Sequence, residues 1–418
     1  MTNNNKSYLY QLFRDTLYYS ISKIIPGLVG ILSVILFFRL IGAEEYGKYS
    51  IIFSFANLIA AFSFGWLNQS ILRYRSTYNS SIKILRPVLL GFIIGIIPLI
   101  TFIIITSIIG FPIIFSNKYI IFLALSIGIF NIIKHTFQSE ELANKVILIT
   151  SYQSILIITC SIIILKLYDN SAESLVFGIS LGYLMPILPY SKLFSINVIT
   201  KKNIKKIKPF FNYGAPLSIW LAISLSLSLL DRYFIEYHYG SSLMGSYAGF
   251  SEFIIRILSI LIFPITLAVH PILMNKWNKN KNIHEFFVKL FKASMIQILI
   301  CLIMLIPVYF FKEDFFYFIQ IMIPGIDSSM KEIIIPIFIG GFLWQLALVL
   351  HKPLEIEERT LIMVFCIMFS LVTNLIGNIF FLPKFGIIAT AYTMISTASI
   401  YILSSILFCK SFRNFIKR

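Results

Sequence analysis

Two basic side chains in this sequence lie inside long apolar stretches, where little water is available to solvate a charge. They are Lys23 and Arg256. A charge at membrane depth is costly and usually faces the protein interior or a water-filled cavity. Both residues are therefore predicted to bind an anionic group. Arg suits a phosphate because its planar guanidinium presents a fork of donors.

Lys23 belongs to a polar stripe in the first apolar stretch. Tyr19, Lys23, Pro26 and Gly30 follow each other at i, i+4, i+7 and i+11, so they share one helix face. Pro26 favours a kinked helix. A simpler interpretation of Lys23 stays open: its ammonium lies about two turns from the helix end and could snorkel to lipid headgroups.

Arg256 belongs to a second stripe, formed by Glu252, Arg256 and Ser259 at i, i+4 and i+7. The simple alternative is an ion pair within one helix, because Glu and Arg four residues apart neutralise each other. Even that alternative turns this helix face into the protein, since an ion pair facing lipid is expensive.

A third stripe combines an aromatic ring, hydroxyls and a carboxylate: Trp220, Ser224, Ser228 and Asp231. Such a face suits a sugar or a headgroup, although serines also serve to pack membrane helices together. A fourth stripe consists of Ser370, Asn374 and Asn378, for which we expect hydrogen bonds between helices.

The composition indicates that membrane-spanning helices position these residues. The chain of 418 residues is 58% hydrophobic and 13% charged, with a mean hydropathy of +0.86. These values lie outside the range of soluble globular domains and predict an all-α polytopic membrane protein. We expect about twelve membrane-spanning helices, from residues 16–40 to residues 385–408. The four cysteines lie singly, which indicates neither a metal site nor a disulfide framework.

The basic residues predict how the helices are oriented. Of 35 Lys and Arg, 25 lie in the two terminal tails and the even-numbered loops, and 8 lie in the odd-numbered loops. Because basic residues near span ends stay cytoplasmic, both termini are predicted to be cytoplasmic. The net charge of +17 is spread over these loops, so it favours contact with anionic lipid headgroups rather than nucleic acid.

The chain contains an internal repeat. Residues 42–49 and 240–247 both read GxxxxGxY, and an Arg ends the preceding apolar stretch in each copy (Arg39 and Arg232). We therefore predict two six-helix lobes, 1–200 and 211–418, joined by a basic cytoplasmic linker at 201–210. Two-lobed transporter folds of this kind bind substrate between the lobes and expose it alternately to each side.

Three stretches carry a resemblance to a known family. They are residues 40–49, residues 212–218 leading through Asp231-Arg232 to 245–248, and residues 373–388. They make the chain similar to the polysaccharide flippases of the Wzx type. These belong to the superfamily of the MATE multidrug antiporters and the lipid II flippase. The likeness extends over essentially the whole chain, with a departure at Ala389-Thr390, where similar proteins usually have Gly-Ala.

The resemblance implies a MATE-like fold with a central cavity. It also implies a substrate, an undecaprenyl-diphosphate-linked oligosaccharide such as an O-antigen repeat unit of lipopolysaccharide. The substrate would be moved outward across a bacterial inner membrane. The candidate coupling ions are H⁺ and Na⁺, and the candidate partners are other polysaccharide-assembly proteins. No catalytic residue, cofactor or metal is implied. The implicated cavity residues are Lys23 and Arg256 for the anionic substrate, and Asp231, Glu252, Ser228 and Trp220 for ion coupling or a polar lining.

Two other functions stay open. A MATE-like antiporter of cations or drugs would have an enclosed acidic cavity, whereas the charges inside these spans are of both signs. A membrane-embedded glycan polymerase or ligase typically carries a large external loop with catalytic basic residues. The longest external loop expected here, residues 312–332, has some 20 residues, and no hydrolytic or metal-binding motif stands out.

The predicted orientation can be tested with a single cysteine placed between Lys201 and Lys208. A membrane-impermeant thiol reagent should label it in inside-out vesicles and leave it unlabelled in intact cells. A cysteine at Asp169, in an odd-numbered loop, is the matched control and should show the opposite pattern. Labelling of the basic segment in intact cells would reverse the topology.

Overall fold

The protein is built from membrane-spanning helices. The computed structural model describes residues 2–78, 81–108, 117–194, 200–280 and 283–416, and the regular structure in these ranges is helical. Ten of the described helices are long and apolar enough to cross a membrane. Two of these candidates have 50 and 72 residues. About 20 residues cross the hydrocarbon core, so each of the two must supply two spans.

A glycine divides each of the two long helices. Helix α1 (Thr2–Tyr74) leaves helical geometry at Gly42, with φ 77° and ψ 173°, and α6 (Lys201–Asn280) does so at Gly240, with φ 85° and ψ 169°. Such positive φ values favour glycine, which has no Cβ. With both breaks counted, the described residues supply twelve spans. The predicted class, an all-α polytopic membrane protein, is confirmed.

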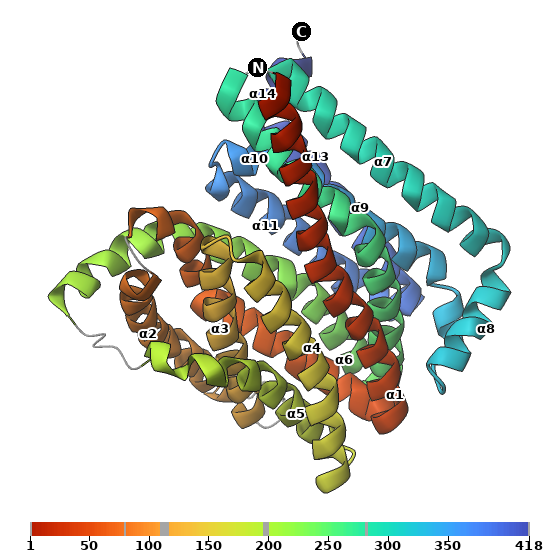
Figure 1. The fold of residues 1–418 in the computed structure, drawn as a ribbon. Helices are drawn as coiled ribbons and strands as arrows, with labels where there is room; N and C mark the ends of the chain where they lie inside the picture. Colours follow the sequence, from red (N-terminus) through yellow and green to blue (C-terminus); the bar gives the residue numbers. More distant parts are fainter. Residues whose placement is uncertain (1, 79–80, 109–116, 195–199, 281–282, 417–418) are drawn as a thin grey trace. The chain divides into compact units, whose positions relative to one another are not determined.

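Contacts between helices divide the chain into two compact units. Unit 2 comprises Lys48–Leu229. Helices α3, α4 and α5 pack side by side in it (Figure 1), around a core that includes Phe130, Ile133 and Ile149. Besides the arms of α1 and α6, its elements are η1 (Arg75–Thr77), α2 (Ser81–Ile108), α3 (Asn117–Ser139), α4 (Ala143–Leu167), α5 (Ala172–Leu184) and η2 (Met185–Phe194).

Unit 1 comprises Met1–Gly47 and Leu230–Arg418. Helix α13 packs between α9 and α11 (Figure 1). Besides the arms of α1 and α6, the elements are α7 (Ile283–Phe310), α8 (Lys312–Met322), η3 (Ser328–Lys331), α9 (Ile334–Leu350), α10 (Lys352–Ile356), α11 (Thr360–Ile376), η4 (Gly377–Phe381, a π-helical turn), α12 (Leu382–Phe385), α13 (Ile387–Phe408) and α14 (Lys410–Ile416).

The two copies of the repeated motif contact each other in unit 1. A Cβ on Gly47 would collide with the carbonyl oxygen of Ser241, and a Cβ on Gly245 would collide with the carbonyl oxygen of Ala43. Each glycine therefore lets the backbone of one copy approach that of the other. The contact explains why both copies of the motif have glycine at this position, Gly47 in the first and Gly245 in the second.

The predicted lobes at 1–200 and 211–418 and the linker at 201–210 remain predictions. The basic segment 201–208 is itself helical, because α6 begins at Lys201.

The connection between α7 and α9 is folded as well. Arg39 donates hydrogen bonds to the carbonyl oxygens of Ile321 (2.5 Å) and Met322 (2.9 Å), at the C-terminal end of α8. Cations stabilise this end of a helix, where carbonyl groups have no partner within the helix. The backbone N–H of Asp327 donates to Ser246 Oγ at 3.2 Å. Arg39, just before the first repeat motif, and Ser246, within the second, thus hold this connection in place.

Candidate functional site

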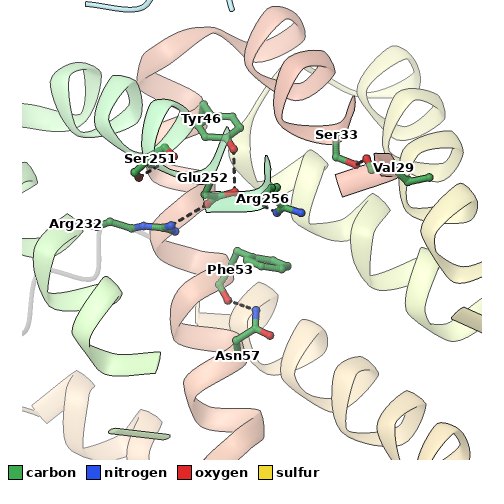
Figure 2. A network of polar contacts seen from close by, with 10 residues as sticks. Val29, Ser33, Tyr46, Phe53, Asn57, Arg232, Ser251, Glu252 and Arg256 are labelled. Atoms are coloured by element: carbon green, nitrogen blue, oxygen red, sulfur yellow. Dashed lines mark hydrogen bonds and ion pairs between the residues drawn. The ribbon is translucent and has the colours of Figure 1, made fainter. Parts of the chain in front are cut away.

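The carboxylate of Glu252 is the centre of a polar network in unit 1 (Figure 2). Arg232 Nη2 lies 2.8 Å from Glu252 Oε1, and Arg256 Nη2 lies 3.2 Å from Oε2. The hydroxyl of Tyr46 donates to Oε2 at 3.3 Å. Three side chains from three helical segments therefore converge on one carboxylate.

The break at Gly240 brings Arg232 and Glu252 together. In a straight helix, two residues 20 positions apart lie about 30 Å from each other. Here their side chains form an ion pair, because α6 reverses at Gly240 and the residues just before and just after this bend lie close together. Arg256 reaches the same carboxylate from one turn further along the second arm.

The two arginines of this network differ in accessibility. The Arg232 side chain is 8% exposed and that of Glu252 is 14% exposed, whereas the Arg256 side chain is 33% exposed. Arg256 lies over Gly30 of α1, where a Cβ would collide with its guanidinium. Arg232 is thus the buried member of the network, and Arg256 is its more exposed member.

A second buried polar group surrounds Asp231. Asn374 and Asn378 each donate an amide N–H to Asp231 Oδ1, at 2.9 and 2.8 Å. The hydroxyl of Thr390 donates to Asn378 Oδ1 at 3.0 Å. Asp231 is 6% exposed, and its neighbour Arg232 attracts it electrostatically. Asn378 lies in the π-helical turn η4, a distortion that often marks functional sites.

The structure brings only some of the predicted site residues together. Glu252 and Arg256 belong to the first of the two networks described above, and Asp231 belongs to the second. Trp220 and Ser228 lie on the arm of α6 that belongs to unit 2, where Trp220 is half-buried and Ser228 is exposed. Lys23 lies within α1, and its side chain is outside the described part of the chain.

The stripe of Ser370, Asn374 and Asn378 forms the predicted bonds between helices. The two asparagines bond to Asp231 on α6, and Ser370 Oγ donates to the carbonyl oxygen of Thr397 on α13 at 3.1 Å. This prediction is confirmed.

Sequence reasoning missed Arg232 and Tyr46 as partners of Glu252. The sequence showed that Arg232 ends an apolar stretch, as Arg39 does. The two arginines nevertheless have different partners, because Arg39 binds carbonyl oxygens of α8 and Arg232 binds Glu252. Tyr46 occupies a variable position of the GxxxxGxY motif, so no pattern distinguished it. In the described ranges, no group of three or more His, Cys, Asp and Glu side chains is arranged to hold a metal ion.

This arrangement of helices is found in known transporters. A structure described as lipid II flippase MurJ in an inward closed conformation aligns with a TM-score of 0.71 and 18% identity, over 96% of this chain and 89% of that one. An inward-facing MATE multidrug transporter aligns with a TM-score of 0.65 and 14% identity, over 96% of both chains. The eukaryotic MATE transporter AtDTX14 aligns with a TM-score of 0.62 and 11% identity, over 98% of both chains.

These TM-scores show that the protein has the fold of the MurJ and MATE transporters. Residues 12–277, more than half of the chain, match the family described as polysaccharide biosynthesis protein. The chain therefore belongs to the polysaccharide biosynthesis protein family. No curated protein matches its sequence.

The ion pair between Arg232 and Glu252 should contribute strongly to stability. In a double-mutant cycle of Arg232→Gln and Glu252→Gln, we expect a coupling free energy of about 1–3 kcal/mol. Glu252→Gln leaves the buried Arg232 without its carboxylate, and Arg232→Gln leaves Glu252 with Arg256 alone. The measurement is thermal unfolding in nanodiscs. The exposed pair Lys289–Glu285 is the matched control and should show a coupling near zero. Additive effects of Arg232→Gln and Glu252→Gln would contradict this account.

Proposed function

We propose that this protein is a flippase for a lipid-linked oligosaccharide. In this proposal it moves undecaprenyl-diphosphate carrying an oligosaccharide repeat unit, such as an O-antigen unit, from the cytoplasmic to the outer face of a bacterial inner membrane. The two lobes would expose a polar cavity alternately to each side, and no covalent bond would change. The family and the MurJ-like fold support the proposal.

The observation that carries the proposal is the position of Arg256. Its side chain is one-third exposed on a membrane-spanning helix, and its guanidinium is paired with Glu252. Glu252 serves two arginines, so these three side chains together carry one net positive charge. A diphosphate is the part of a lipid-linked sugar that such a cation would recognise, since guanidinium binds phosphate oxygens bidentately.

Lys23 fits the same role by its place on the chain. It precedes Gly30 by seven residues, or about two helical turns, so the two positions share a face of α1. Arg256 lies against Gly30 on that helix. The proposal therefore assigns the diphosphate to Arg256 and Lys23 together.

The two carboxylates of the site have different surroundings, and we assign them different roles. Glu252 is held by two arginines, which suits a permanent counter-ion that positions them. Asp231 accepts hydrogen bonds from neutral amides and is deeply buried. Asp231 is therefore the candidate for binding a coupling H⁺ or Na⁺. Ser228 and Trp220 remain candidates for the polar lining of the substrate path.

The alternative functions fit the described residues less well. A cation antiporter needs a carboxylate that a positively charged drug can reach, but Glu252 is already paired with arginines and Asp231 with amides. A glycan polymerase or ligase needs catalytic groups. The external connection 312–332 is folded against the protein by Arg39 and Ser246, and burial raises the pKa of the Cys409 thiol to about 11, which makes it a poor nucleophile.

Replacing Arg256 tests the anion site. Arg256→Ala should reduce flipping of an undecaprenyl-diphosphate-linked oligosaccharide in proteoliposomes by at least about tenfold, equivalent to about 1.4 kcal/mol. Arg256→Lys should retain part of the activity, since it keeps the charge without the fork of donors. The exposed Lys289→Ala is the control. Full activity in the Lys23→Ala and Arg256→Ala double variant would exclude these residues as the substrate site.

Replacing Asp231 tests ion coupling. Asp231→Asn keeps the size of the side chain but removes its charge, so flipping should no longer respond to an imposed Na⁺ or H⁺ gradient. The measurement compares flipping rates with and without each gradient. Asp314→Asn, at an exposed position, should respond as the wild type does. An unchanged response in Asp231→Asn would remove Asp231 from the coupling mechanism.

A further inference from the structure

A second cluster of titratable side chains lies in unit 1, where the chain passes from α9 through α10 to α11. His351 ends α9 and is 3% exposed. Its Nδ1 is in a hydrogen bond of 3.1 Å with the hydroxyl of Tyr401 on α13. Its Nε2 lies 3.7 Å from Glu355 Oε2 on α10. The imidazole is therefore held between a phenol and a carboxylate.

Glu355 is shared with a lysine. Lys352 Nζ donates to the same Oε2 at 2.5 Å. The side chain of Lys352 is 14% exposed and that of Glu355 is 34% exposed. The pair is partly shielded from solvent, so its charges act strongly on neighbouring groups.

A second imidazole belongs to this cluster. His270 of α6 interacts electrostatically with Lys352, Glu355 and His351. Its Nδ1 is buried and has no hydrogen-bond partner among the described residues. An unpaired buried nitrogen is uncommon in folded proteins and calls for an explanation. The bond between His351 and Tyr401 can be structural, but a structural role does not explain why Nδ1 of His270 is left without a hydrogen-bond partner.

The charges of the cluster leave it able to accept one proton. With both imidazoles neutral, Lys352 and Glu355 cancel and the cluster carries no net charge. A proton on His351 would be stabilised by Glu355, which lies 3.7 Å from its Nε2, and opposed by Lys352. Among the described residues, the titratable groups that face His351 include Tyr401 from α13, His270 from α6, and Lys352 and Glu355 from α10.

We propose that His270 and His351, together with the Lys352–Glu355 pair, form a proton-binding site near the α9–α11 connection. The site takes up one proton from solution onto an imidazole nitrogen and makes no other bond. The imidazolium then competes with Lys352 for Glu355, which loosens the short helix α10. By the predicted topology this connection faces the cytoplasm. Its role in transport rests on the proposed flippase function, since a proton released here would complete inward proton movement.

Proton uptake can be measured without any substrate. In nanodiscs, ¹⁵N-histidine NMR between pH 5 and 8 should show His270 and His351 titrating as a coupled pair. His351→Gln should let His270 take up its proton at higher pH, because a competing cation is lost. Glu355→Gln should shift both imidazoles to lower pH. His238→Gln, at an exposed position outside the cluster, should change neither. The proposal would be overturned if both imidazoles stayed neutral down to pH 5, or if the two histidines titrated independently of each other.

A flipping assay separates this proposal from the proposed function. Proteoliposomes would be prepared with undecaprenyl diphosphate bearing a labelled disaccharide, and the pH would be varied on one side at a time. The wild type and His238→Gln should flip with a rate that depends on pH at the α10 side, and the His270→Gln, His351→Gln variant should lose that dependence. A wild type that flips with the same dependence as the double variant would overturn the proton site. A wild type that never flips this lipid would overturn the proposed function instead.

Discussion

The sharing of Glu252 between two arginines is the interaction on which the rest of the site depends. Charges inside a membrane must be paired or face water. Arg232 and Glu252 can pair only because α6 reverses at Gly240. That pairing fixes Glu252, and Glu252 in turn positions Arg256 over Gly30. One glycine conformation and one carboxylate thus place the guanidinium to which we assign the anionic substrate.

The same arrangement separates two carboxylates that the sequence alone made equivalent. Glu252 and Asp231 both belong to α6, and both lie in buried surroundings. Glu252 has cationic partners and serves as a counter-ion, whereas Asp231 has amide partners supplied by α11 and η4. Neutral partners can rearrange at lower cost when a carboxylate binds a proton or a metal cation. This difference in partners supports the assignment of coupling to Asp231.

Local patterns in the sequence predicted much of this structure, and long-range contacts account for what they missed. Hydropathy predicted the spans, because a membrane helix needs about 20 apolar residues. The spacing of Glu252 and Arg256 left their pairing open as an alternative, because residues four positions apart lie on one helix face. The repeated glycines at 42 and 240 were visible, but their backbone angles were not. The reversal at Gly240 brings Arg232 to Glu252, and no pattern in the sequence indicated it. No pattern indicated the contact between Arg39 and the end of α8 either.

The central claim is that the protein moves a lipid-linked sugar between leaflets, and reconstitution of the wild-type protein tests it most directly. The measurement is the fraction of undecaprenyl-diphosphate-linked oligosaccharide headgroups that a membrane-impermeant reagent can reach over time. The account predicts that headgroups become accessible only in proteoliposomes containing the protein. Headgroups that stay in their original leaflet, while the same vesicles exchange a cationic drug for H⁺ or Na⁺, would contradict it.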